Sequence, residues 1–408
     1  MKIIYLHQYF NTPKMKGGTR SYEMARRMVA AGHEVHMVTS IREEDSSSSE
    51  WSQTNEDGIH VHWLSVPYNN RMSYLKRILA FFQFAIKARK KAVELGGDII
   101  FATSTPLTIA IPAVYAKKKL KIPLVFEVRD LWPELPIVMG AIKSPILKWA
   151  ARKLERYAYF NSEHVVGLSP GMSEGVVATG FPKEKISTIP NSCDLELFDP
   201  AVNSGAEFRS RFPWLQDRPL VIYAGTLGHI NGVAYLAELA AQVYKLNPDV
   251  RFLVIGAGVD EENVRTRATE LGIYEKNFFM LDIIAKHDIP SVFAAATIST
   301  SLFINLPEMW ANSANKFFDA LAAGKPVAIN YGGWQKEIVE KEGLGVVLST
   351  EPNEEAARSL VNLIESKERL FQSGECSRKV AEEVFSRDIL AAKLIDVIEK
   401  THLKSVSR

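Results

Sequence analysis

The amino-acid sequence predicts an α/β fold made of two doubly wound domains, and three observations carry that prediction. The chain has 408 residues, which exceeds the roughly 250–300 that one hydrophobic core accommodates. Short apolar runs alternate with longer amphipathic stretches through both halves, as strands and helices do around parallel sheets. Hydrophobic residues make up 47% of the chain and charged residues 24%, a composition that is typical of packed proteins and excludes disordered and fibrous ones.

The first domain is predicted over residues 1–200. Lys2–Leu6 is an apolar run, a helical pattern follows from Ser21 to Ala31, and Val35–Ser40 is apolar again, which is the pattern of a βαβ unit. We expect a loop at Ser46–Ser49. Further strands are expected at Ile59–Ser65, Ile99–Thr103, Leu124–Val128, His164–Leu168 and Ile186–Ile189.

The second domain is predicted over residues 201–385, after a proline-rich stretch with little periodicity from Pro190 to Pro219. A helix is expected at Gly232–Lys245, and strands are expected at Pro219–Ala224, Val250–Ile255, Phe278–Leu281, Thr297–Leu302 and Pro326–Ile329. Residues 386–408 contain a last helix, Arg387–His402. The sequence allows this helix to pack on either domain, including a return to the first. Because doubly wound domains bind ligands at the carboxyl ends of their strands, we expect the two domains to face a central cleft.

Cysteine usage and the chain start indicate a cytosolic protein. Only Cys193 and Cys376 are present, so no disulfide framework is possible and a reducing compartment is favoured. Met1–Tyr5 enters an apolar run without a basic segment and cleavage site, so no signal peptide is predicted. The most apolar stretch, Ile99–Tyr115, is interrupted by polar residues and prolines, so it is too short to span a bilayer.

A basic amphipathic helix is predicted in the first domain, because no acidic residue occurs from Gly58 through Val93. Leu75, Leu79, Phe82 and Ile86 fall on one helical face. Such a helix either rests on anionic lipid or lies on the core with a solvated basic face. The cations assigned to a membrane or acceptor side are Lys76, Arg77, Lys87, Lys90 and Lys91.

Two segments are typical of phosphate binding. Gly17-Gly18 follows the first strand and opens a helix, which brings backbone N–H groups close to an anion, although an ordinary strand-to-helix turn fits equally well. The segment NSANKFFDALAAGKPV, residues 312–327, starts a helix after a polar loop. Its free N–H groups are expected to hold a phosphate, with Lys316 as a charge beside it and Asp319 accepting hydrogen bonds from a ribose. The alternative is a capped helix with a surface Lys–Asp pair. The loop residues concerned are Asn312, Ser313, Ala314 and Asn315.

These segments resemble glycosyltransferase family 4, whose members have the GT-B fold. The resemblance is carried by KGGTRSYEMARRMVAAGHEVHMVTS (16–40), IPNSCDLELF (189–198), YAGTLGHING (223–232) and residues 312–327, which together span nearly the whole chain. LVFEVRDLWPE (124–134) and INYGGWQKEIVE (329–340) resemble a narrower group, bacterial fucosaminyl- and N-acetylhexosaminyltransferases of surface-polysaccharide assembly.

The sequence departs from the family pattern at two places. The paired glutamates of the family would fall at 311 and 319, where this chain has Ala311 and Asp319, so Glu308 is the candidate replacement for the first carboxylate. The loop containing Thr226 and Gly228 lacks the Arg and Lys that many members place there. The resemblance then assigns more of the phosphate charge to Lys316 and to backbone amides.

The resemblance implies a retaining, metal-independent transferase that moves a sugar from UDP to a polyprenyl-diphosphate-linked saccharide. The sugar would be an N-acetylated hexosamine or deoxyhexosamine, and the products would enter O-antigen, capsule or exopolysaccharide. The protein would lie at the inner face of a bacterial plasma membrane and bind anionic lipid but no nucleic acid. No cofactor other than the UDP-sugar substrate is expected.

Two further contacts are assigned from positions at strand ends. Asp130 follows the strand 124–128, where α/β enzymes place functional groups, and is the candidate acceptor-side base or orienting group. A structural salt bridge with Arg129 or another partner is the alternative. Asp282 and Ile283 follow the strand 278–281 and are expected to contact uracil through main-chain atoms.

Two other functions remain open from sequence. A UDP-sugar 2-epimerase shares the two-domain architecture. A non-catalytic scaffold binding lipid or nucleic acid is the other, because residues 1–200 hold 26 lysines and arginines against 20 aspartates and glutamates.

Overall fold

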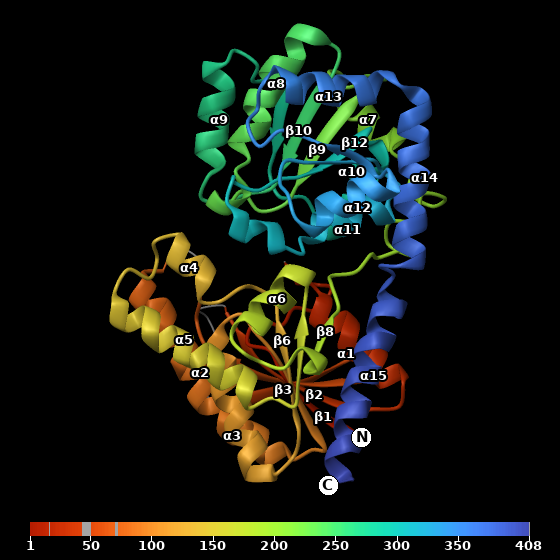
Figure 1. Cartoon of the computed structure of the whole chain (residues 1–408). Coiled ribbons are helices and arrows are strands. Elements are labelled where there is room, and N and C mark those ends of the chain that lie inside the picture. The colour runs from red at the N-terminus through yellow and green to blue at the C-terminus, as the bar shows by residue number, and fades with distance from the viewer. Residues whose placement is uncertain (16, 43–49, 70–71, 408) are drawn as a thin grey trace. The chain divides into compact units, whose positions relative to one another are not determined.

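The computed structural model describes residues 1–15, 17–42, 50–69 and 72–407, so the predicted loop at Ser46–Ser49 lies outside the described residues. Contacts divide the chain into two units (Figure 1). The first comprises Met1–Pro190 together with Asp388–Arg408, and the second comprises Asn191–Arg387. The division therefore falls at Pro190, ahead of the position 200 expected from sequence.

The first unit contains an eight-stranded sheet with the order β3-β4-β2-β1-β5-β6-β7-β8. All neighbouring pairs are parallel except β3 with β4. Strand β3 was not predicted, because it is largely polar and exposed and joins the sheet only as a hairpin with β4. The bounds are β1 Lys2–Leu6, β2 Glu34–Ile41, β3 Trp51–Glu56, β4 Ile59–Ser65, β5 Ile99–Thr103, β6 Leu124–Val128, β7 His164–Gly167 and β8 Ile186–Thr188.

Helices cover both faces of this sheet (Figure 1). They are α1 Arg20–Ala30, α2 Tyr74–Leu95, α3 Ala110–Leu120, α4 Glu134–Val138, α5 Pro145–Phe160 and α6 Pro170–Ala178. The last helix of the chain, α15 (Arg387–Val406), contacts this unit. Its Glu399 carboxylate lies 3.1 Å from His33, and Asp388 lies 2.7 Å from Arg27 of α1.

The second unit contains a six-stranded parallel sheet with the order β11-β10-β9-β12-β13-β14. Its strands are β9 Leu220–Ala224, β10 Arg251–Ile255, β11 Phe278–Leu281, β12 Ile298–Ser301, β13 Val327–Ile329 and β14 Gly345–Val347. Strand β14 was not predicted; it begins with a glycine and its three residues are only half-buried. The helices are α7 Ala206–Ser210, α8 Ala234–Leu246, α9 Glu261–Glu270, α10 Ile289–Ala295, α11 Asn315–Ala322, α12 Trp334–Glu342, α13 Glu354–Glu365 and α14 Lys367–Glu383.

Both sheets are buried between helices, which explains why their central strands are apolar on both faces. Every residue of β5 and β6 is buried. Glycines allow the tight approach of neighbouring loops: a Cβ at Gly256 would lie 1.9 Å from the Gly225 carbonyl oxygen. The Gly256-Ala257-Gly258 turn is therefore packed against another loop. Among the helices described, none has the length and apolar character needed to cross a membrane.

Candidate active site

The candidate donor site lies where the strand order reverses in the second unit. Strands β9 and β12 are neighbours, but the chain leaves them toward opposite edges of the sheet, through β10 and β13 respectively. Such a switch point leaves a crevice at the carboxyl ends of the two strands, which is where open α/β sheets bind ligands. The loop after β9 and the segment from β12 to α11 both start here.

Lys316, in the first turn of α11, places its ammonium group among uncharged partners. Its Nζ donates to the Tyr223 hydroxyl at 3.0 Å and lies 4.6 Å from the centre of the Tyr223 ring and 5.6 Å from that of Phe303. With the Asn231 amide oriented to satisfy both of its ends, the amide oxygen accepts from Nζ at 3.3 Å. These contacts fix the ammonium group without neutralising it.

Burial lowers the pKa of Lys316 from 10.5 to about 8, and Asp319 opposes the shift only partly. In the part of the chain that is described, Lys316 forms no ion pair. An enclosed cation without a counter-ion is costly to hold in place and is typical of a site that receives an anion.

Tyr223, Asn231 and Phe303 were not identified from sequence. From the sequence, Tyr223 was recognised only as a residue of strand β9. In the structure its hydroxyl also donates to the Thr226 carbonyl at 2.8 Å. The sequence signal that could have identified Tyr223 was its position two residues before Gly225, in the motif at 223–232. The environment of Phe303 becomes visible only once β9 and β12 are known to be neighbours.

The loop before α11 is braced by its own polar side chains. Asn312 donates to the Met309 carbonyl at 2.9 Å and accepts from the Ala314 N–H at 3.2 Å. The Ser313 hydroxyl accepts from the Asn191 N–H at 2.9 Å. No side chain caps α11 at Ala314, and Asn315 at its first position is exposed. The positive end of the helix dipole is thus left for a ligand.

Asp319 follows Lys316 by one helical turn but forms no ion pair with it. Its charge acts on Cys193: burial first, and then Asp319, raise the pKa of that buried thiol. The alternative of a surface Lys–Asp pair is therefore wrong. The proposed ribose contact of Asp319 stays a prediction.

Glu308 lies in the short helix η5, Pro307–Ala311, upstream of this loop. Its Oε2 is enclosed and has no hydrogen-bond partner among the residues that the structure describes, which leaves it able to accept a hydrogen bond from a hydroxyl. Gly228 precedes the helical turn η3, His229–Asn231, and so belongs to the loop whose Asn231 contacts Lys316. The structure thus gathers Thr226, Gly228 and Lys316 at one switch point.

Asp282 and Ile283 follow β11, which is the edge strand of the sheet. Both are exposed, and 54% of Ile283 is accessible to solvent. Their expected main-chain contact with a base remains a prediction.

Trp334 fills space behind the donor loop. Its indole donates to the Asn312 carbonyl at 2.8 Å, and its ring packs 6.3 Å from Phe318. The tryptophan is therefore a support for the loop.

The glycine loop of the first unit is exposed to solvent, whereas the neighbouring Arg20 is buried. Gly17 and Gly18 are exposed, and the Gly18 carbonyl accepts from the Asn11 amide at 3.3 Å. Gly17 has φ +124°, which favours glycine. Arg20, by contrast, is buried and pairs with Glu127 at 2.8 Å. The glycines remain candidates for backbone contacts.

Asp130 lies beyond β6 and accepts from the Thr105 hydroxyl at 3.1 Å. Among the described residues, no ion pair joins Asp130 to Arg129 or to another partner, so the structure does not support the alternative of a salt bridge. Thr105 follows β5, and β5 and β1 form the switch point of the first sheet. Asp130 is thus held beside the equivalent crevice of that unit.

Helix α2 exposes its apolar stripe to solvent. The exposed fractions are 73% for Leu75, 67% for Leu79, 43% for Phe82 and 49% for Ile86. The core instead receives Ala80, Phe84, Ala85, Ala88 and Ala92. Helix α2 therefore does pack on the core, but through these residues, and the predicted apolar stripe is not part of that contact.

The cations assigned to α2 differ in their surroundings. Lys76 and Lys90 are exposed, whereas Arg77 and Lys87 are half-buried. Lys91 pairs with Glu94 at 2.9 Å, so it contributes less free charge than the sequence suggested.

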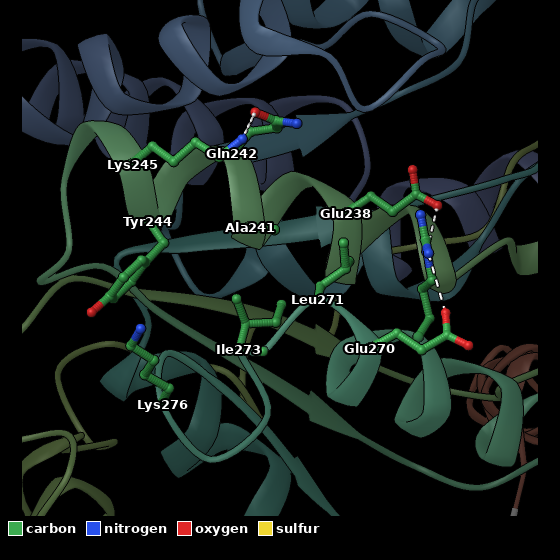
Figure 2. A pocket seen from close by; sticks show the side chains of 11 residues that line it. Glu238, Ala241, Gln242, Tyr244, Lys245, Glu270, Leu271, Ile273 and Lys276 are labelled. Atoms are coloured by element: carbon green, nitrogen blue, oxygen red, sulfur yellow. Dashed lines mark hydrogen bonds and ion pairs between the residues drawn. The ribbon is translucent and has the colours of Figure 1, made fainter.

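A depression of about 450 Å³ lies between α8 and α9 (Figure 2). Its charged groups are already satisfied: Arg267 pairs with Glu238 at 3.0 Å and Glu270 at 3.2 Å. The Lys276 ammonium lies 4.1 Å from the Tyr244 ring centre. None of the predicted site residues lines this depression, and we assign it no catalytic role. No cluster of three or more metal-binding side chains occurs among the residues described.

Two domain families match the chain. Residues 17–192 match the glycosyl transferase 4-like domain, and residues 206–380 match glycosyl transferases group 1. Spore coat protein SA of Bacillus subtilis is 25% identical over 237 residues, 55% of this chain and 62% of that protein. An Escherichia coli UDP-Gal:alpha-D-GlcNAc-diphosphoundecaprenol alpha-1,3-galactosyltransferase is 26% identical over 200 residues, 48% of this chain and 49% of that protein. The matched segments span about half to three fifths of the length of each of these two relatives.

Solved structures cover the whole chain. Sucrose-phosphate synthase from Thermosynechococcus elongatus superposes with a TM-score of 0.78 at 16% identity, covering 98% of both chains. Anabaena HepE in complex with UDP-glucose gives a TM-score of 0.74 at 19% identity, covering 98% of this chain and 100% of that one. At these identities the likeness concerns the fold. Together with the two domain matches, it establishes that the chain belongs to glycosyltransferase family 4 and has the GT-B fold.

Proposed function

We propose that the protein is a glycosyltransferase that uses a UDP-sugar as donor. The observation that carries this proposal is the Lys316 ammonium group, which is enclosed beside the uncapped start of α11 and has no ion-pair partner among the described residues. A departing diphosphate would supply the missing negative charge. The barrier for sugar transfer falls when the negative charge that develops on the leaving group is stabilised.

The acceptor in this proposal is a saccharide linked to polyprenyl diphosphate. The E. coli relative is named for such an acceptor, α-D-GlcNAc-diphosphoundecaprenol. The exposed stripe of α2 supports a position at an anionic membrane surface, because apolar side chains flanked by lysines bind the interface of such membranes. We place the protein at the inner face of the plasma membrane, in assembly of a surface polysaccharide such as O-antigen.

The transfer we propose retains the anomeric configuration. The bond from the anomeric carbon to the phosphate oxygen breaks, the acceptor oxygen bonds to that carbon on the same face, and its proton passes to the departing phosphate. Asp130 would orient the acceptor hydroxyl, and the unpartnered Oε2 of Glu308 would accept a donor-sugar hydroxyl. Lys316 and the start of α11 would carry the leaving-group charge without a metal.

The test combines donor binding with product analysis. UDP-sugars, including UDP-N-acetylhexosamines and their deoxy forms, are screened by thermal shift. The best donor is then incubated with a prenyl-diphosphate-GlcNAc acceptor in EDTA, and products are identified by mass spectrometry. A new sugar on the acceptor is expected. Epimerised donor formed without acceptor would instead identify a 2-epimerase, and no UDP-dependent stabilisation would contradict the proposal.

A further inference from the structure

Three arginines meet at the strand ends of the first unit. Arg42 follows β2, Arg129 follows β6, and Arg77 lies in the first turn of α2. Strands β2, β1, β5 and β6 are consecutive in the sheet and parallel, so the residues after them share one edge.

His7, which follows β1, links two of these arginines. The Arg129 Nη1 lies 3.5 Å from His7 Nε2. Burial, then Arg129 and Arg42, hold the pKa of His7 well below its ordinary value. A neutral histidine thus sits between two guanidinium groups.

Aromatic rings link Arg42 and Arg77. The Arg42 guanidinium lies 5.8 Å from the Tyr9 ring centre, and that of Arg77 lies 5.6 Å from the Tyr68 ring centre. Tyr9 and Tyr68 are 4.8 Å apart, and Phe81 of α2 lies 5.7 Å from Tyr68. Arg42 and Arg77 therefore border one aromatic cluster, which we define as Tyr9, Tyr68 and Phe81.

Within the described residues, the three guanidinium groups make only neutral contacts. Arg42 donates to the Asn11 amide oxygen, and Arg77 donates to the Tyr68 hydroxyl at 3.1 Å. Over the described ranges of the chain, no carboxylate lies within ion-pair distance of Arg42, Arg77 or Arg129. Glu127 acts on Arg129 at longer range, but that carboxylate is already bonded to Arg20.

Two other half-buried arginines without an ion pair in the described ranges, Arg209 and Arg251, donate instead to backbone carbonyls. Arg387 of the second unit, for comparison, pairs with Asp194. Guanidinium groups retain several N–H donors in a planar fork that matches phosphate oxygens. Three of them without carboxylates at one sheet edge fit a ligand with more than one negative charge.

We propose that Arg42, Arg77 and Arg129 bind the diphosphate of the lipid-linked acceptor, with its first isoprene units against the aromatic cluster. The proposal rests on the proposed function for the identity of the acceptor. It explains why arginines, which bind anions, and aromatic rings, which bind apolar chains, occur together at this edge. All three arginines belong to the first unit, whereas Lys316 belongs to the second.

Isothermal titration of the full chain with farnesyl diphosphate tests the site. We expect Arg42→Gln, Arg77→Gln and Arg129→Gln each to weaken binding by about tenfold or more, since each removes a charge-assisted phosphate contact. Farnesol, which lacks the charge, and inorganic diphosphate, which lacks the chain, should both bind more weakly than farnesyl diphosphate. Arg152→Gln is the matched control, because Arg152 already pairs with Glu134 at 3.0 Å, and it should bind like the wild type.

Several outcomes separate this site from its alternatives. Wild-type affinity in all three glutamine variants would overturn the proposal. Displacement of farnesyl diphosphate by phosphatidylglycerol vesicles but not by inorganic diphosphate would assign the arginines to lipid headgroups and also overturn it. If a glutamine variant fails to fold, the corresponding Arg→Lys variant keeps the charge and should show a smaller loss. UDP-induced stabilisation should persist in every variant; its absence in the wild type would reject the donor proposal while leaving this site intact.

Discussion

Replacing Lys316 by methionine should stabilise the free protein and abolish most of its response to UDP. Methionine keeps the length of the side chain and removes the charge. The ordinary lysine pKa of 10.5 falls to about 8 here, and each factor of ten is worth about 1.4 kcal/mol. The enclosed charge therefore costs up to about 3 kcal/mol. Loss of the hydrogen bond to Tyr223 offsets about 1 kcal/mol of the gain.

The expected net gain is about 1–2 kcal/mol, or roughly 2–8 °C in Tm for a unit of this size. The gain should be full below pH 8 and shrink toward pH 10.5. In that window the unfolded lysine still holds its proton whereas the folded one has lost it, so wild-type stability rises with pH.

Ligand stabilisation should change in the opposite direction. UDP at one hundred times its wild-type Kd stabilises by about 2.7 kcal/mol. Loss of a charge-assisted contact of about 1.5–3 kcal/mol would leave about 0.4–1.4 kcal/mol in the variant at the same concentration. Differential scanning fluorimetry with and without UDP measures both effects.

Lys325→Met provides the control for this prediction. Burial and Arg209 also lower the pKa of Lys325 to about 8, but its Nζ donates to the Ala294 carbonyl at 2.8 Å, at the other end of α11. This variant should keep the full UDP response. A Lys316→Met protein that is no more stable than the wild type and retains its UDP response would refute the reasoning.

Three further predictions concern the first unit. Asp130→Asn should keep UDP binding and lose at least about 10²-fold in transfer rate, measured with saturating donor; normal turnover would remove Asp130 from the mechanism. Leu79→Glu with Phe82→Glu, on exposed positions of α2, should abolish sedimentation with phosphatidylglycerol vesicles while leaving UDP binding unchanged; an unchanged partition would exclude α2 as the membrane contact. Burial, then Glu134, raise the pKa of Glu155 to about 7, so its contribution to stability is full below about pH 4.5 and lost as the pH rises to 7. Glu155→Gln should therefore flatten the decline of Tm in that window, and an unaltered profile would count against the raised pKa.

Sequence patterns predicted most strands closely where the strand was long and buried. Lys2–Leu6, Ile59–Ser65, Ile99–Thr103 and Leu124–Val128 have the same bounds in the structure. Strand β3 was missed because its residues are polar and its position depends on pairing with β4. Apolar burial leaves a pattern in the sequence, whereas edge pairing does not.

The direction of an amphipathic face was not determined by sequence. Leu75, Leu79, Phe82 and Ile86 form a regular apolar stripe, which on its own fits a core position as well as an exposed one. The structure places alanines of the same helix against the core instead. Small residues pack closely onto the sheet, so the larger apolar side chains remain outside.

Sequence by itself determined the fold class, the family and the segment that contains Lys316, because these depend on local periodicity and on contiguous motifs. Only the tertiary structure decided what surrounds the ammonium group and which arginines have no ion pair with the described residues. Tyr223, Asn231 and Phe303 come from separate segments that meet when β9 and β12 pair. The charge state of a site depends on burial and on neighbours brought together across the sheet, and neither quantity is written in the order of residues.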